Sequence, residues 1–464
     1  MLRHTANRMN TVLSGRALTA ADDEFKDVRC GFYSQTDPLP QLVVLCKNEK
    51  DIAHCLSVAR QERLAFAIRS GGHSIAGFSS CQDMVIDVSA LNSIRIDAAQ
   101  ETVCVGAGAR LEAIVSALDA HGLHIPVGTC GTVGIAGFMQ GGGYGYTSRS
   151  YGMNCDLVLE FRMMLANGEI VTANRQQHAD LFWAVRGGGG GNFGVLLDVI
   201  YQAQQLDRVW AFAFEWPWRQ AAGSLQQILD FSHQLNRNRE LGYMANICKK
   251  SGEPRLLIQG MCTLGRSRGL DCLASIPAMS RMELLVDEVG SFGEMNLLLD
   301  EKPYPVPEIT PAFAGKRYDI IKESGYIETS LTEKTWQAVL DEFSAQPQPW
   351  NMIVIEPYGG SIRSFGGSPC AFTHRDVCAN VYNNVFYQKE TQQEEATQAS
   401  RRIHDSLRAH MNGHRYPNYP QRGLKNFGWV YWGDAYQQLV EVKNRYDSEH
   451  FFRFPQSIGT LIDT

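Results

Sequence analysis

The sequence has no surplus of positive charge. Lysine and arginine together number 43 against 49 aspartates and glutamates, which gives a net charge of −6. A protein whose main partner is nucleic acid or an anionic membrane usually carries basic runs or patches, and no long basic run occurs here. The charge balance therefore argues against both partners. With 44% hydrophobic and 20% charged residues, the chain otherwise has the composition of an ordinary globular protein.

Long apolar runs are also missing. No stretch reaches the roughly 18 apolar residues that a membrane helix needs. The first residues, MLRHTANRMNTVLSGRALTAADD, contain no apolar core of the kind that secretory signals have. We therefore expect a protein that is neither inserted in a membrane nor exported, and we predict a cytoplasmic location.

The cysteines follow no disulfide or metal-site spacing. The chain has 12, scattered from Cys30 to Cys378, and no CxxC pair occurs among them. In the absence of an export signal, most are expected to be buried, reduced thiols. No internal repeat or low-complexity tract is present, so the chain is expected to fold into ordinary domains.

Glycine is the residue in excess. Much of it falls in three stretches: RSGGHSIAG (69–77), GTCGTVGIAGFMQGGGYG (128–145) and RGGGGGNFG (186–194). A glycine turn after a strand presents backbone N–H groups that bind phosphate, and dense glycine lets backbone pass close to a flat or charged group. Taken alone, each stretch also fits a structural turn or a mobile loop. A further stretch, GAGAR (106–110), has Leu111 where a dinucleotide fingerprint needs glycine, and it is interpreted as an ordinary turn.

Two reactive side chains lie inside these stretches. His73 is in the first and Cys130 is in the second. Each is a nucleophile within backbone suited to holding phosphate or a flat ring. Two such positions in one half of a chain suggest a cofactor tethered at two points, and a tethered cofactor usually means redox chemistry. A structural histidine is the alternative for His73 alone.

Hydrophobic periodicity divides the chain into regions with different patterns of predicted secondary structure. Up to about residue 123, apolar strand segments alternate with amphipathic helices, which indicates an α/β unit with a glycine turn at the end of a strand. From about 205, alternating segments such as VWAFAFEW (209–216) indicate antiparallel strands with helices between them. A proline-rich stretch, PYPVPEITP (303–311), is interpreted as a linker. Near the end, AYQQLVEVKNRYD (435–447) predicts a helix.

Together these segments resemble the FAD-linked oxidases of the berberine-bridge-enzyme type, within the vanillyl-alcohol-oxidase flavoprotein superfamily. The resemblance spans nearly the whole chain, and the matching segments include RSGGHSIAG, GTCGTVGIAGFMQGGGYGYTSRSYGMNCD, ADLFWAVRGGGGGNFGV, AFTHRD (371–376), YPNYPQ (416–421) and a tail at 431–458. It implies an α+β fold in three parts: a PCMH-type FAD-binding domain of two α/β subdomains at 1–205, a substrate domain with a large antiparallel sheet covered by helices at 206–410, and a C-terminal segment at 411–464 that returns to the FAD domain.

The resemblance also assigns residues to the cofactor. His73 matches the histidine bonded to the 8α-methyl carbon of the flavin, and Cys130 matches the cysteine bonded to flavin C6, so FAD held by two covalent bonds is implied. No metal is expected. The other residues expected to bind FAD lie in and around the glycine stretches and the YPNY segment: Arg69, Ser70, Gly71, Gly72, Ser74, Gly128, Thr129, Thr132, Val133, Gly134, Gly137, Gly141, Gly142, Tyr144, Gly145, Gly194, Val195 and Asn418.

In this family the substrate loses hydride to flavin N5, and a base removes the hydroxyl proton when the substrate is an alcohol. The resemblance points to Tyr419 as the base, with Tyr416 as a neighbour or wall residue. Ionising a tyrosine of pKa near 10 at pH 7 costs about 4 kcal/mol, so a hydrogen-bond partner or a positive charge must reduce that cost. The resemblance also implies a second polar residue on the substrate-domain sheet, a few positions after His374 and Arg375, which falls on Tyr382 or an immediate neighbour. Alkaloid-cyclising relatives have a carboxylate there. A buried strand aromatic is the alternative for Tyr382.

The resemblance further implies how the reduced cofactor is reoxidised. Val133 matches a position where valine accompanies access of oxygen to the flavin, although it also fits a core residue. Gln421 departs from the aspartate of many relatives, which puts the hydrogen bonding around Tyr419 in question. The leading hypothesis is an FAD-dependent oxidase that acts on an alcohol or sugar hydroxyl of a bulky, natural-product-like substrate and forms hydrogen peroxide with molecular oxygen. The alternatives are an oxidative cyclase, C–H oxidase or dehydrogenase of the same family, and a flavin-binding module without turnover.

Overall fold

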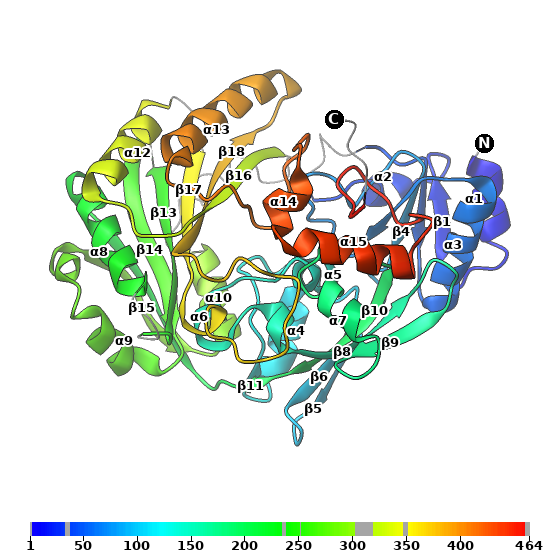
Figure 1. Cartoon of the computed structure of the whole chain (residues 1–464), viewed down its shortest axis with the longest axis horizontal. Coiled ribbons are helices and arrows are strands. Elements are labelled where there is room, and N and C mark those ends of the chain that lie inside the picture. The colour runs from blue at the N-terminus through cyan, green and yellow to red at the C-terminus, as the bar shows by residue number, and fades with distance from the viewer. Residues whose placement is uncertain are drawn as a thin grey trace.

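The computed structural model describes residues 2–32, 38–233, 238–250, 252–301, 319–346 and 351–459. The proline-rich stretch 303–311 lies outside the described residues. Figure 1 shows two parts side by side: the first two hundred residues, in blue to green, and a large sheet with its helices, in green to orange. The expected α+β class is confirmed.

A four-stranded sheet forms the N-terminal part. Its strand order is β1-β2-β4-β3, with β2, β4 and β3 parallel and β1 antiparallel at one edge. The apolar runs of β2 and β4 are buried, as strands covered on both faces require. The strands are β1 (Arg16–Thr19), β2 (Leu42–Leu45), β3 (Phe66–Arg69) and β4 (Met84–Asp87), and the helices are α1 (Leu2–Met9), α2 (Phe25–Val28) and α3 (Glu49–Glu62). The glycine turn 69–77 begins where β3 ends, as expected.

A five-stranded antiparallel sheet follows, in the order β5-β6-β10-β8-β9. The second glycine stretch is partly helical, because α5 lies within it and α6 follows just after it. The strands are β5 (Ile94–Asp97), β6 (Thr102–Gly106), β8 (Val158–Met164), β9 (Ile170–Asn174) and β10 (Val195–Gln202), with β7 (Leu123–His124) paired to β11 (Gln204–Gln205). The helices are α4 (Leu111–Asp119), α5 (Ile135–Gln140), α6 (Ser148–Tyr151), η1 (Asn154–Leu157) and α7 (Ala179–Val185).

The third sheet has seven antiparallel strands in the order β15-β12-β14-β13-β17-β18-β16. They are β12 (Val209–Trp216), β13 (Leu241–Lys250), β14 (Glu253–Cys262), β15 (Glu283–Gly290), β16 (Asp319–Ile327), β17 (Asn351–Pro357) and β18 (Ala379–Tyr387). The helical elements of this part are η2 (Trp218–Gln220), α8 (Ala221–His233), α9 (Gly265–Leu273), η3 (Pro277–Arg281), α10 (Phe292–Glu301), α12 (Glu333–Ala345), η4 (Gly360–Ile362), η5 (Glu390–Gln392) and α13 (Gln393–Arg408).

The two faces of this sheet pack against different layers. The alternation expected in 209–216 is present: Trp210 and Phe212 belong to the core shared with α8 and α12, whereas Ala211 and Ala213 belong to the core shared with the glycine-rich part. Figure 1 shows α8, α12 and α13 along the side of the sheet that faces away from the glycine-rich part. The inner face of the sheet can therefore form one wall of a site between the two parts.

The C-terminal segment returns to the glycine-rich part. Helices α14 (Phe427–Trp432) and α15 (Ala435–Tyr446) cross back toward it (Figure 1). The buried Lys443 ammonium fixes this return, since it donates to the carbonyls of Asn192 and Phe452 and to the carboxylate of Asp447. We propose 1–205, 206–410 and 411–464 as the domain boundaries, with the first falling between β10 and β12.

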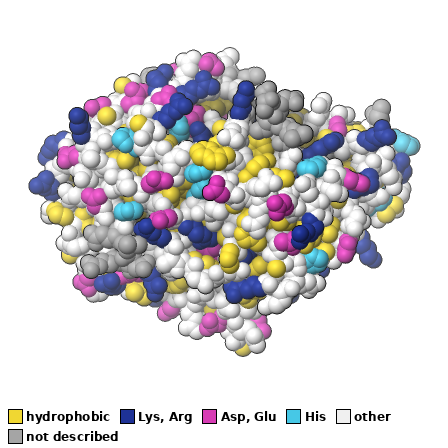
Figure 2. Space-filling model, in the orientation of Figure 1, with side chains coloured by type: hydrophobic (Ala, Val, Ile, Leu, Met, Phe, Trp, Pro, Cys, Tyr) yellow, Lys and Arg dark blue, Asp and Glu magenta, His cyan; other side chains and the backbone are white. Residues whose placement is uncertain are grey.

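The surface carries charges of both signs. On the face shown in Figure 2, basic and acidic side chains are interspersed. Within the part of the chain that the structure describes, no helix has the length and apolar content to cross a bilayer. Of the 12 cysteines, 8 are buried, as expected.

Candidate active site

A cavity of about 410 Å³ lies between the glycine-rich part and the inner face of the seven-stranded sheet. Ligand sites commonly occupy concave spaces of this size between domains. Most of the residues expected at the site line this cavity: Ser70, Gly71, Gly72, His73, Ser74, Gly128, Thr129, Cys130, Val133, Gly134, Gly137, Tyr144, Gly194, Tyr382, Tyr416, Asn418 and Tyr419.

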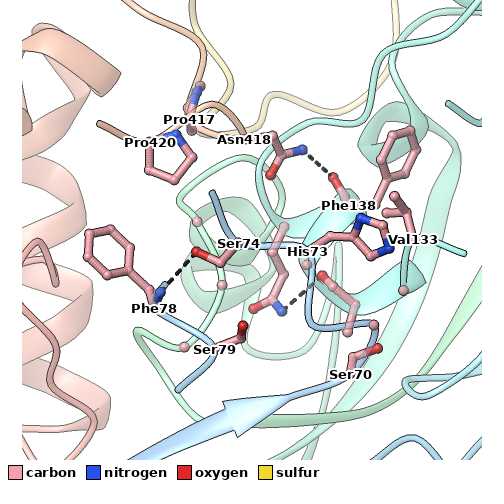
Figure 3. Close-up of a pocket in the computed structure, with 18 of the residues that line it drawn as sticks. Ser70, His73, Ser74, Phe78, Ser79, Val133, Phe138, Pro417, Asn418 and Pro420 are labelled. Atoms are coloured by element: carbon pink, nitrogen blue, oxygen red, sulfur yellow. Dashed lines mark hydrogen bonds between the residues drawn. The ribbon is translucent and has the colours of Figure 1, made fainter. Parts of the chain in front are cut away.

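Three segments far apart in the sequence meet in this lining (Figure 3). The turn after β3 is held by the backbone N–H of Phe78, which donates to Ser74 Oγ at 3.0 Å. The YPNY segment is joined to α5, because Asn418 Nδ2 donates to the carbonyl of Phe138 at 2.9 Å. These contacts place the first two glycine stretches and the C-terminal segment around one space.

Glycine is required where the first two stretches touch. A Cβ at Gly71 would lie 2.3 Å from the backbone nitrogen of Gly134, and a Cβ at Gly134 would lie 2.3 Å from Ser70 Oγ. Contacts that short do not occur, so only two glycines let the backbones approach this closely. The close approach brings the segment of His73 against the segment of Cys130.

His73 and Cys130 share one neighbour, the Thr132 hydroxyl. His73 Nε2 lies 3.0 Å from Thr132 Oγ1, and Cys130 Sγ lies 3.3 Å from the same oxygen. The His73 ring also stacks on Phe32, with ring centroids 4.1 Å apart. Burial, aided by the positive charge of Arg110, lowers the pKa of His73 to about 4, so the imidazole is neutral and nucleophilic at neutral pH.

Two charged residues of the cavity were not expected from the sequence. Glu356 on β17 accepts a hydrogen bond from the Tyr419 hydroxyl at 2.8 Å, and Asn380 Nδ2 donates to its other oxygen at 2.8 Å. The Lys322 ammonium, from β16, lies 4.2 Å from the centre of the Tyr382 ring and 4.0 Å from the centre of the Tyr419 ring. The lining of the cavity includes Glu356, Lys322, Tyr382 and Tyr419 but not Asn380.

Burial sets the charge states of this cluster. It raises the pKa of Glu356 to about 7, a shift that Asn380, Tyr419 and Lys322 limit by stabilising the carboxylate. Burial also lowers the pKa of Lys322 to about 8. The pKa of Tyr419 is raised by burial and then by the Glu356 charge, so its hydroxyl keeps its proton at neutral pH. The cluster therefore pairs a tyrosine donor with a carboxylate that ionises near neutrality.

Comparisons with known proteins agree with this architecture. A family model described as an FAD binding domain matches residues 40–174, and one described as berberine and berberine like matches residues 415–459. The FAD-linked oxidoreductase YgaK of Bacillus subtilis, itself uncharacterised, is 28% identical over 97% of this chain and 98% of its own length. The chain is an FAD-dependent oxidoreductase that is similar along its length to berberine-bridge-enzyme-like proteins.

Further relatives share the whole length of the enzyme. The FAD-linked oxidoreductase pynB of Aspergillus niger is 26% identical, with 96% of this chain and 90% of that protein covered. Among solved structures, Physcomitrella patens BBE-like 1 superposes with a TM-score of 0.88 at 22% identity, covering 98% of both chains. A chitooligosaccharide oxidase superposes with a TM-score of 0.84 at 18% identity, covering 98% of this chain and 100% of that one. At these identities the structures establish the shared fold.

The lining of the flavoenzyme's cavity fits FAD. Gly137 faces it from α5, and a Cβ there would meet nothing within 4 Å. Gly190 and Gly191 line the cavity as well, so the third glycine stretch is part of the site rather than only a loop. Ser79 Oγ and Gln140 Oε1 are buried in the lining, and neither has a hydrogen-bond partner among the described residues. Open glycine surface and unpaired polar atoms are what a flat, polar cofactor would cover.

Some residues expected to touch FAD lie behind the lining. Arg69 pairs with Asp87 at 2.7 Å instead of facing the cavity. Thr132 contacts His73 and Cys130. The remaining four are held by packing against other segments, and they are Gly141 against Asn418, Gly142 against Phe372, Gly145 against Val127, and Val195 in the β10–β8 pair.

The other YPNY tyrosine has a different environment. The hydroxyl of Tyr416 accepts hydrogen bonds from the backbone N–H groups of Gly143 and Tyr144, at 2.9 and 3.1 Å, and from Asn418 Nδ2 at 3.1 Å. Its ring meets that of Tyr419 edge-on, with centroids 4.9 Å apart. Tyr416 thus forms the wall beside Tyr419 and holds the second glycine stretch.

The departure at Gln421 leaves Tyr419 undisturbed. The Gln421 side chain accepts a hydrogen bond from the Arg415 guanidinium, and its backbone N–H donates to the Tyr431 hydroxyl. The Tyr419 hydroxyl is engaged by Glu356 instead. The hydrogen bonding of the catalytic candidate is therefore supplied by the sheet and not by its own loop.

Proposed function

We propose that this flavoenzyme is an oxidase that takes hydride from the carbon bearing an alcohol or sugar hydroxyl in a bulky, natural-product-like substrate. When bound, FAD would supply the hydride acceptor and a route for the two electrons to dioxygen, with hydrogen peroxide as the product. The observation that carries the proposal is the hydrogen bond from Tyr419 to Glu356, inside the cavity that His73 and Cys130 also line. Molecular oxygen and the small-molecule substrate are the only partners it requires.

The pair gives the substrate proton a place to go. Tyr419 accepts the hydroxyl proton of the substrate as its own proton passes to Glu356 over 2.8 Å. With the pKa of Glu356 raised to about 7, about half of the molecules hold the carboxylate form at neutral pH. No free tyrosinate is needed, so the cost of about 4 kcal/mol for ionising tyrosine alone is avoided.

Lys322 supplies positive charge where negative charge develops. Its ammonium faces the rings of Tyr419 and Tyr382, and a cation held over an aromatic ring out of water is worth about 2 kcal/mol or more. With its pKa lowered to about 8, Lys322 is still mostly charged at neutral pH. It thereby stabilises the oxygen of Tyr419 as that oxygen loses its proton.

We propose that FAD is held covalently by His73 and Cys130. The support is the neutral His73 imidazole, the placement of both side chains in the cavity lining, and their common contact with Thr132. Acid-denatured protein should keep its yellow colour, and peptide mass spectrometry should find FAD on the peptides of both residues. Release of free FAD on denaturation would contradict the covalent model.

Glu356 also favours one alternative. A carboxylate in the cavity could act directly on a substrate, as in an oxidative cyclase or C–H oxidase, without Tyr419. Peroxide release screened against glycosylated and polyketide-type alcohols, followed by Tyr419→Phe on the best substrate, separates the two. Loss of turnover supports alcohol oxidation, whereas retained turnover with loss in Glu356→Gln supports the alternative. The cytoplasmic location stays a prediction.

A further inference from the structure

Thr132 lies between the two side chains proposed to hold FAD. Its Oγ1 is 3.0 Å from His73 Nε2 and 3.3 Å from Cys130 Sγ, while its own side chain stays behind the cavity lining. A hydroxyl has one proton to donate and lone pairs to accept with. Thr132 can donate to only one of its two neighbours, so at least one of them must donate to it, and this links the proton positions on His73 and Cys130.

The neutral state of His73 gives this chain of hydrogen bonds a direction. A neutral imidazole carries one N–H. With that proton on Nε2, His73 donates to Thr132, Thr132 donates to the Cys130 sulfur, and the lone pair used for bond formation resides on Nδ1. Burial keeps His73 in the neutral form on which this arrangement depends. The same hydroxyl thus selects the imidazole tautomer and holds the sulfur in place.

We propose that Thr132 is a positioning residue for the attachment of FAD, acting on His73 and Cys130 together. This inference rests on the double attachment of the proposed function. It assigns to Thr132 the orientation of both attacking groups, and it couples the two attachments to one another.

Each attachment balances with dioxygen as the oxidant. At His73, a C–H bond of the 8α-methyl group and the imidazole N–H bond break, and a C–N bond forms. At Cys130, the C6–H and S–H bonds break, and a C–S bond forms. In both cases two protons and two electrons reduce one dioxygen to hydrogen peroxide. The Nε2–H of His73 is held in a hydrogen bond to the Thr132 oxygen while Nδ1 forms the C–N bond, and its proton, like that of the Cys130 S–H, is then released to solvent and counted among those that form hydrogen peroxide.

The test follows attachment itself rather than turnover. Full-length protein from FAD-poor cultures is incubated with FAD in air, quenched in acid at intervals, and digested, and mass spectrometry measures FAD on the His73 and Cys130 peptides separately. We expect Thr132→Val, which keeps the shape but removes the hydroxyl, to slow attachment at both residues about tenfold, the effect of losing one or two hydrogen bonds. Thr132→Ser, the matched control, should stay within about twofold of wild type.

The outcomes separate the two proposals. If the wild type carries FAD on neither peptide, the double attachment is wrong. If the wild type carries FAD on both, and Thr132→Val matches its rates, only the role of Thr132 is wrong. Thr132 is only partly buried, so the substitution should fold, and Thr132→Ala provides a second variant that also removes the hydroxyl. Slowing at one peptide alone would overturn the coupling.

Discussion

Tyr419 and Glu356 form a 2.8 Å hydrogen bond although they come from distant parts of the sequence, one from the C-terminal segment and the other from β17. The bond joins the C-terminal segment to the sheet and gives tyrosine a carboxylate partner whose pKa is raised to about 7 by burial. Proton removal can then be shared between two residues, neither of which is a strong base alone.

Replacing the carboxylate should stop turnover with little effect on folding. Glu356→Gln keeps the hydrogen-bond geometry but removes the proton acceptor, so we expect kcat to fall by about 10² to 10⁴, the usual worth of a general base. KM should change little, because the residue acts on the proton and not on binding. Steady-state peroxide formation measures both constants. The control is Glu342→Gln, outside the site on α12, which should leave both at wild-type values.

Activity should rise and then fall with pH. The Glu356 carboxylate must be ionised, so kcat rises as pH increases through about 7, and the Lys322 ammonium must be charged, so kcat falls as pH increases through about 8. Because Glu356 and Lys322 titrate as a coupled pair, the apparent pKa values of the rising and falling limbs of the pH profile describe the pair and not either residue alone. Lys322→Met should remove the alkaline limb and lower the maximum. A profile flat from pH 6 to 9 in the wild type would count against both assignments.

Each covalent bond should suffice to retain the cofactor. His73→Ala and Cys130→Ala taken singly should keep FAD attached through the other residue, whereas the double variant should release it on acid precipitation. Absorbance of the supernatant at the flavin maximum gives the released fraction. Release from either single variant would show that the other residue forms no bond.

Val133 should govern the reaction with oxygen. It lines the cavity next to the Cys130 segment, so a larger side chain there would narrow the space beside the flavin. We expect Val133→Leu to slow reoxidation of reduced enzyme by at least about tenfold while leaving anaerobic reduction by substrate unchanged. Stopped-flow mixing with air-saturated buffer measures the first rate. Equal reoxidation rates would mean that Val133 is a core residue only. Val133→Ala, which shortens the side chain instead of enlarging it, is the control.

Local sequence patterns predicted much of the fold. Residues close in the sequence determine the apolar run of β2, the alternation in β12 and the glycine turn after β3. All three features could therefore be predicted from the sequence. The α5 helix was missed, because Gly137 within it and the glycine-rich backbone around it obscure helix propensity.

The site was predicted on one side only. His73, Cys130 and Tyr419 lie in long motifs, whereas Glu356 and Lys322 lie on strands whose contribution depends on sheet register. Glu356 pairs with Asn380 and Lys322 pairs with Asn384, so both lie on the same face of the sheet as Tyr382. No single strand encodes that register. A lone acid in the apolar segment NMIVIEPYGG was the signal available for Glu356.

The central claim is that Tyr419, backed by Glu356, removes the proton of a substrate hydroxyl as hydride leaves. The most direct test is the anaerobic rate of flavin reduction by an alcohol substrate, measured by stopped-flow for wild type and Tyr419→Phe. Our account predicts a rate at least about 10² lower in the variant, with the flavin spectrum and attachment unchanged. Reduction of the variant at the wild-type rate would contradict it.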